Sequence, residues 1–120
     1  MAESTKTRGD RGELLAEKYL RKAGYRLLER NYRKPFGEID IIAEQGDCLV
    51  FVEVKLRKNS RYGTPAQAVN FKKQQKIIRT AQAYLAEGRC FDRNIRFDII
   101  EVYDGGAVPA LRHLKGAFGA

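Results

Sequence analysis

The chain has 120 residues, which is enough for one domain whose core needs neither a disulfide nor a structural metal. Its 23 Lys and Arg outnumber its 15 Asp and Glu and leave a net charge of +8, which favours a polyanionic partner, with nucleic acid ahead of a membrane surface. The sequence shows no signal peptide, no apolar run near the ~20 residues that span a bilayer, no basic amphipathic segment with exposed aromatics, and no zinc-site spacing around Cys48 and Cys90. We therefore expect a soluble cytoplasmic protein that does not bind membranes.

The first half of the chain predicts a helix followed by strands. A flexible polar tail over residues 1–8 precedes a single domain over residues 9–118. The first helix, residues 9–23, has one apolar stripe and ends before a glycine. Strands are expected at residues 25–32, 38–44 and 48–56, because β-branched and aromatic residues are concentrated there.

The second half predicts another helix and one or two more strands. Thr64 is the expected N-cap and Pro65 the first residue of a helix that extends to Glu87, with Phe71 and Ile78 on its inner stripe. A fourth strand over residues 95–103 and a short fifth over residues 111–114 complete the order α-β-β-β-α-β-(β). Successive strands followed by a helical crossover predict an α/β fold, a mixed sheet with helices packed on it.

The turn between the second and third strands sets a register with chemical consequences. Gly46-Asp47 suits a two-residue type II′ turn, with glycine at the position that needs positive φ. Counting back from this turn places Asp40 opposite Glu53 and Glu38 opposite Lys55. Directly opposite residues share a face of the sheet, with Cβ atoms roughly 4.5–5.5 Å apart.

Two facing carboxylates repel each other unless a cation compensates them. Their hard oxygen ligands favour Mg²⁺ or Mn²⁺, and the ammonium of Lys55 reaches the same site. The alternative is a solvated strand face with a cross-strand ion pair. The apolar residues Ile42, Leu49 and Phe51 on the predicted face argue for the site instead.

Basic residues are grouped near this hairpin. Arg57, Lys58 and Arg61 follow the third strand, and Lys72, Lys76 and Arg79 recur at i, i+4 and i+7 on the second helix. Such a ridge can contact successive phosphates, and a solvated helix face is the alternative for each residue taken singly. Of the helix residues, Lys72 is the strongest candidate because it lies nearest the helix start.

Three further residues have simpler interpretations from the pattern alone. Glu13, at the edge of the first helix's apolar stripe, is either a third carboxylate or a boundary glutamate. His113, the only histidine, has no evident partner and is expected to be structural or on the surface, not catalytic. Asp98 alternates with apolar residues in Arg96-Phe97-Asp98 and is expected to pair with a basic neighbour, with a catalytic role as the alternative.

Short motifs along nearly the whole chain resemble the bacterial YraN family. They include Gly12-Glu13, Gly24-Tyr25, Asn31-Tyr32, Gly37-Glu38-Ile39-Asp40-Ile41-Ile42-Ala43, Phe51-Val52-Glu53-Val54-Lys55 with Arg57, and Arg96-Phe97-Asp98. The YraN family resembles archaeal Holliday-junction resolvases and the restriction-endonuclease-like PD-(D/E)xK nucleases. The resemblance implies a single-domain three-layer α/β/α sandwich around a mixed sheet. Ile39 stands where the nuclease motif has proline.

The resemblance also assigns roles to matching residues. Asp40, Glu53, Lys55 and Glu13 are the implied catalytic residues, and Asp40, Glu53, the carbonyl of Val54 and Glu13 the implied metal ligands. The expected protein is a Mg²⁺- or Mn²⁺-dependent endonuclease that hydrolyses phosphodiester bonds in DNA, branched or structured DNA included. The alternative is a module that binds DNA or RNA without cleaving it, although a pure binder has no need of facing carboxylates. Junction resolvases cut two symmetric strands, so the resemblance is also compatible with a homodimer.

Overall fold

The computed structural model describes residues 5–57, 69–88, 92–103 and 109–119, with side chains described from Asp10 onward. These described residues form two helices and five strands in the predicted order. Their bounds are α1 (Thr5–Lys22), β1 (Arg26–Lys34), β2 (Gly37–Gln45), β3 (Cys48–Arg57), α2 (Phe71–Gly88), β4 (Asn94–Tyr103) and β5 (Ala110–Phe118).

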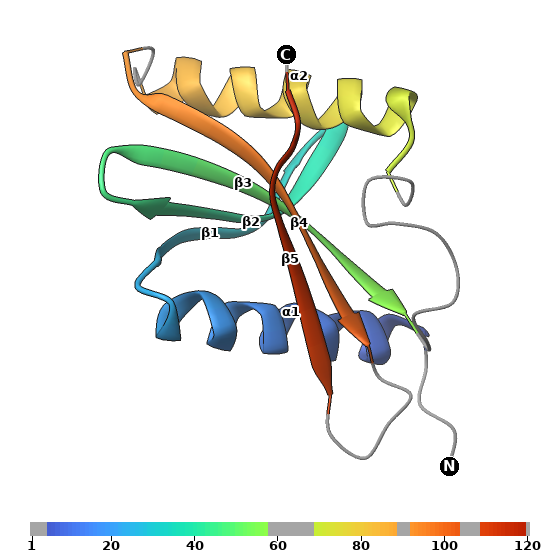
Figure 1. Ribbon diagram of the computed structural model, residues 1–120. Helices are drawn as coiled ribbons and strands as arrows, with labels where there is room; N and C mark the ends of the chain where they lie inside the picture. The colour runs from blue at the N-terminus through green and yellow to red at the C-terminus, as the bar shows by residue number, and fades with distance from the viewer. Residues whose placement is uncertain (1–4, 58–68, 89–91, 104–108, 120) are drawn as a thin grey trace.

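The strands form one mixed sheet in the order β1-β2-β3-β4-β5. Only β3 and β4 are parallel, since α2 connects them as a crossover, and the other neighbours pair antiparallel. Helix α1 covers one face of the sheet and α2 covers the other (Figure 1). The predicted α/β fold is therefore confirmed, and its layers are those of an α/β/α sandwich.

Each face of the sheet has its own apolar core. Ala16 and Leu20 of α1 pack against Ile41, Val50 and Ile100. On the other face, the apolar residues of α2 pack against the opposite side of the same strands; this cluster includes Ile77, Ala81, Ile42, Phe51 and Ile99. Because the central strands are buried on both faces, their sequences contain nearly continuous runs of apolar residues, mainly Ile and Val.

Both helices begin at other positions than the sequence predicted. Thr5 to Arg8, assigned to a flexible tail, belong to α1. Helix α2 begins at Phe71, because Asn70 caps it: its Oδ1 accepts a hydrogen bond from the backbone N–H of Lys73 at 2.9 Å. A helix running unbroken from Pro65 was therefore wrong, and Thr64 and Pro65 themselves lie outside the described residues.

The last strand is longer than predicted. It reaches Phe118, whose ring stacks on that of Phe97 with centroids 5.2 Å apart, and Leu114 pairs with Ile99 of β4. The interspersed Arg, Lys and Gly residues of β5 concealed this strand, because an edge strand needs only one apolar side. Among the described residues, no helix is long and apolar enough to cross a membrane.

Candidate active site

The β2–β3 hairpin has the register predicted from its turn. Gln45 pairs with Cys48, and Gly46 has a φ of 61°. The pairing continues to Ile41 and Val52 and stops one step before Asp40 and Glu53. Beyond this point a side chain takes the place of a backbone partner: Oδ2 of Asp40 accepts a hydrogen bond from the backbone N–H of Val54 at 2.8 Å.

A distortion in the neighbouring strands accompanies the end of this ladder. Asn31 of β1 has a φ of 50°, the left-handed region that Asn tolerates better than most residues, and it lies between the residues that pair with Ile39 and Ile41. Ile39 packs on the α2 side of the sheet and Ile41 on the α1 side, although regular alternation would put both on one side. The alternation of side chains along β2 is therefore interrupted at Asp40, where the ladder to β3 ends.

A cleft of about 280 Å³ lies at this point, and we refer to it as the acidic cleft. Its lining residues are Asp10, Glu13, Asn31, Arg33, Glu38, Asp40, Glu53, Val54 and Leu56. The structure thus brings together Glu13, Asp40, Glu53 and Val54, which the sequence and its resemblance had singled out. They come from α1, β2 and β3, so the site depends on the tertiary fold.

Two lysines face Glu53, whose side chain is 6% exposed. Lys55 Nζ lies 3.8 Å from Glu53 Oε1, as expected of the predicted lysine. Lys73 Nζ of α2 lies 3.9 Å from the same oxygen, although Lys73 was not among the residues predicted from the sequence. The sequence signal that could have pointed to Lys73 is Ile77, which is buried against the sheet. Lys73 is four residues earlier on the helix and therefore lies on the same side. The predicted stripe began instead at Phe71, which is exposed.

The carboxyl groups of the acidic cleft resist ionisation. Burial, and then the charge of Asp40, raise the pKa of Glu53 to about 7, although Lys73 and Lys55 oppose the shift. Burial and Asp40 likewise raise the pKa of Glu13 to about 7. Burial also raises the pKa of Asp40, against the hydrogen bond from Val54. The cleft is therefore short of positive charge when all three groups are ionised.

Glu13 and Asp40 interact electrostatically, since the charge of Asp40 adds to the effect of burial on the pKa of Glu13. Like charges held this close favour the uptake of a proton or a cation. Within the described part of the chain, no three His, Cys, Asp or Glu side chains stand in metal-ligating geometry. The donor set nevertheless fits a hard divalent cation, since it consists of carboxylate oxygens, and such a cation would offset their mutual repulsion.

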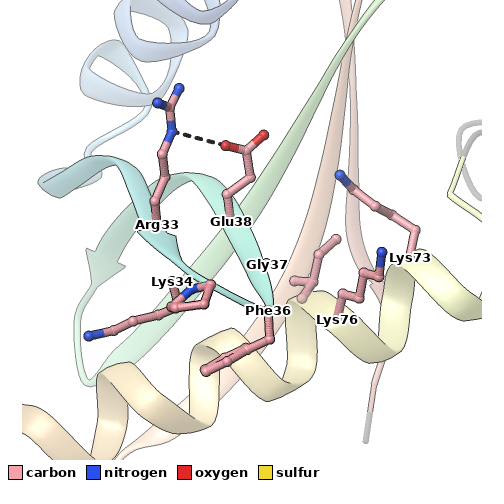
Figure 2. A pocket seen from close by; sticks show the side chains of 9 residues that line it. Arg33, Lys34, Phe36, Gly37, Glu38, Lys73 and Lys76 are labelled. Atoms are coloured by element: carbon pink, nitrogen blue, oxygen red, sulfur yellow. Dashed lines mark hydrogen bonds and ion pairs between the residues drawn. The ribbon is translucent and has the colours of Figure 1, made fainter.

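Glu38 does not pair with Lys55 as the register had suggested. Its Oε2 accepts a hydrogen bond from Arg33 Nε at 3.1 Å, within the β1–β2 hairpin. Arg33 and Glu38 also line a second cavity of about 350 Å³, here called the connecting cavity, with Lys34, Pro35, Phe36, Gly37, Lys73, Lys76 and Ile77. Figure 2 shows Phe36 against α2, with Lys73 and Lys76 extending from that helix toward the same space.

The predicted phosphate-binding residues divide into three groups. Lys72, Lys76 and Arg79 are exposed on α2 beside the β1–β2 hairpin, as the helical spacing predicted. Arg57 is instead engaged within the fold, because its Nε donates to Oε2 of the buried Glu101 at 3.0 Å. Lys58 and Arg61 lie outside the described residues.

A second polar cluster is structural. Asp98, fully buried, accepts two hydrogen bonds from Arg96 at 2.8 Å each and lies 2.6 Å from Nε2 of His113. Tyr19 of α1 hydrogen-bonds to the other ring nitrogen of His113 at 2.9 Å. These contacts link α1, β4 and β5, which confirms the ion pair expected of Asp98. Of the two positions expected for His113, the structure shows the one inside the fold, with Tyr19 and Asp98 as partners that the sequence did not reveal.

The fold and the site define a three-layer α/β protein with buried and half-buried carboxylates next to a basic surface. Comparison with known proteins then gives the family: the chain belongs to the group described as "Uncharacterised protein family UPF0102", the YraN family, whose model matches residues 12–102. A UPF0102 protein of Rhodococcus opacus is 45% identical over 92% of this chain and 94% of its own length. A UPF0102 protein of Alkaliphilus oremlandii is 50% identical over 89% of this chain and 93% of its own.

Proposed function

We propose that this protein is a metal-dependent nuclease that hydrolyses phosphodiester bonds in DNA, with branched or structured DNA as the preferred substrate. The observation that carries the proposal is the convergence of Glu13, Asp40 and Glu53 in one cleft, next to Lys55 and Lys73. A protein that only bound nucleic acid would gain nothing from buried carboxylates that repel each other. The preference for branched DNA rests on the resemblance to junction resolvases.

Asp40 and Glu53 would hold Mg²⁺ or Mn²⁺, with Glu13 as a direct or water-mediated ligand and the carbonyl of Val54 as a further one. The metal would supply an activated water and stabilise negative charge on the phosphate. The N–H of Val54 fixes one oxygen of Asp40 at 2.8 Å, which leaves the other oxygen to act as a ligand. This hydrogen bond orients the carboxylate before any ligand arrives.

The two lysines have separate tasks in this proposal. Lys55, on the same strand as Glu53, orients the attacking water or neutralises charge that develops on the phosphate. Lys73 comes from α2 and keeps Glu53 closer to its ionised form, since it lowers the pKa of that carboxyl. Lysine suits both positions because its compact ammonium adjusts to a small site, whereas the guanidinium of arginine is planar and rigid.

A cleavage panel tests the proposal. Wild-type protein is incubated with four-way junction, duplex and single-stranded DNA and with RNA, each with Mg²⁺, with Mn²⁺ and with EDTA. We expect metal-dependent cleavage of DNA that falls by about 10²-fold or more in Asp40→Asn and Lys55→Ala. Exposed residues of the same types, Glu29→Gln and Lys115→Ala, serve as matched controls and should cut like wild type.

Two outcomes would overturn the proposal. Activity that survives both Asp40→Asn and Lys55→Ala would place the chemistry elsewhere. Binding of these nucleic acids without cleavage of any would leave a nucleic-acid-binding module, the alternative function, with the basic face of α2 as its interface.

A further inference from the structure

A groove of about 560 Å³ lies outside the acidic cleft, between the tip of the β1–β2 hairpin and the exposed face of α2. We call it the aromatic groove. Its lining residues are Pro35, Phe36, Phe71, Lys72, Gln75, Lys76 and Arg79. Its volume is in the range of about 300–1,000 Å³ that is usual for ligand sites. None of these lining residues is acidic, so the groove favours an anionic ligand.

Phe71 is the most unusual residue of this groove. Its side chain is 73% exposed, the largest exposed fraction among the large apolar residues of the described chain. It is the first residue of α2, and Lys72 follows it directly. A single exposed apolar residue is ordinary, but a phenylalanine that lines a groove together with three cations offers both a stacking surface and phosphate contacts.

Arg79 and Phe36 already make a cation–π contact beside this groove. The guanidinium carbon of Arg79 lies 4.4 Å from the centroid of the Phe36 ring. A guanidinium ordered by an aromatic ring can also contact a base or a phosphate of a bound ligand. Lys76, one helical turn from Lys72, adds a second ammonium at a spacing of about 5–6 Å along α2.

The aromatic groove is connected to the candidate active site through a chain of shared lining residues. It shares Pro35, Phe36 and Lys76 with the connecting cavity. The connecting cavity in turn shares Arg33 and Glu38 with the acidic cleft. A chain that occupies the aromatic groove can therefore run along lining residues of these cavities to the carboxylates.

From these observations we propose that the aromatic groove binds an unpaired stretch of single-stranded DNA, with a base stacked on Phe71 and phosphates on Lys72 and Lys76. In a duplex both faces of each base are covered by neighbouring bases, so an exposed phenylalanine can stack only on a base that is unpaired or at an end. The inference takes nucleic acid as the ligand from the proposed function, and it adds which structural form of DNA the protein holds. It does not require that the DNA is cut.

The test is binding in EDTA, where no cleavage takes place. Fluorescence anisotropy measures the affinity for a labelled oligothymidylate of about 16 nucleotides, for a duplex and for an oligouridylate of the same length. We expect Phe71→Ala to weaken binding of the oligothymidylate about 5-fold or more, and binding of the duplex less than about 2-fold. Leu14→Ala, which truncates another exposed apolar side chain (52% exposed), is the matched control and should bind like wild type.

A second variant reports the stacking directly. The chain contains no tryptophan, so Phe71→Trp introduces a single tryptophan at the groove, whose emission can be excited apart from that of the tyrosines. We expect the oligothymidylate to quench its emission and an abasic strand with the same number of phosphates to quench it far less, because stacking needs a base. Phe71→Trp should also retain the affinity that Phe71→Ala loses.

Several results would overturn the inference. These are equal losses for duplex and single strand in Phe71→Ala, no loss at all, a loss confined to the oligouridylate, or equal quenching by the abasic strand. The outcome is separate from that of the proposed function. A protein that binds single strands through Phe71 but never cuts supports the groove and refutes the nuclease. A protein that cuts and binds equally well without Phe71 does the opposite.

Discussion

Replacing Glu53 by glutamine is expected to stabilise the metal-free protein at neutral and alkaline pH. The side chain is nearly buried, and burial together with Asp40 raises its pKa from 4.5 to about 7. A raised carboxyl pKa means that the folded state holds the proton more tightly than the unfolded state does. Stability is therefore highest when this group is protonated, and it falls as the pH rises from about 4.5 to about 7.

The size of the effect follows from the shift. At about 1.4 kcal/mol for each tenfold change in proton affinity, keeping Glu53 ionised in the fold costs about 3 kcal/mol. Glutamine keeps the shape and removes the charge. The gain in unfolding free energy for Glu53→Gln should be about 3 kcal/mol at about pH 8 and less than about 1 kcal/mol at about pH 5. In thermal unfolding, the larger value corresponds to about 10 °C.

Urea unfolding in EDTA at several pH values measures this difference, with the exposed Glu29→Gln as the matched control. A destabilised Glu53→Gln protein, or a gain that does not depend on pH, would refute the argument that the cleft lacks positive charge. Saturating Mg²⁺ should reverse the order of stability, because it stabilises wild type and not the variant.

Three further predictions concern other parts of the fold. Asp98→Ala removes the fully buried acceptor of an ion pair and should lower the unfolding free energy by about 3–5 kcal/mol, measured in urea. Gly37→Ala should cost about 1–3 kcal/mol in the same assay, because a Cβ there would lie 2.6 Å from Oγ1 of Thr80, and Thr80→Ala in the same chain should recover part of the loss. Lys73→Ala should move the acidic limb of the cleavage pH profile upward, because this lysine lowers the pKa of Glu53; an unmoved limb would remove its assigned role.

The sequence predicted the hairpin and its site because local rules decide them. A two-residue turn at Gly46 fixes the register, and the pairing of Gln45 with Cys48 confirms it. Local rules failed where the β2–β3 ladder ends, since alternation cannot show that Asn31 adopts a positive φ or that the ladder stops before Asp40. Glu13 reached the site only through the resemblance, because its position depends on how α1 packs on the sheet.

Helix α2 shows the other limit of sequence-based prediction. The predicted helix began at Pro65, whereas Asn70 caps the helix in the structure. The predicted stripe placed Phe71 inside, which hid both the exposed phenylalanine of the groove and Lys73 at the carboxylates. An error of part of a turn on a helix exchanges buried and exposed positions, so the functional residues of a helix are known only after its packing is known.

Calorimetric titration of Mn²⁺ into the metal-free protein tests the central claim most directly, since it needs neither a substrate nor cleavage. We predict saturable binding to wild type that is lost in Asp40→Asn and in Glu53→Gln and is retained in Glu29→Gln. Absence of binding to wild type, or equal binding to the two cleft variants, would contradict the assignment of these carboxylates as a metal site.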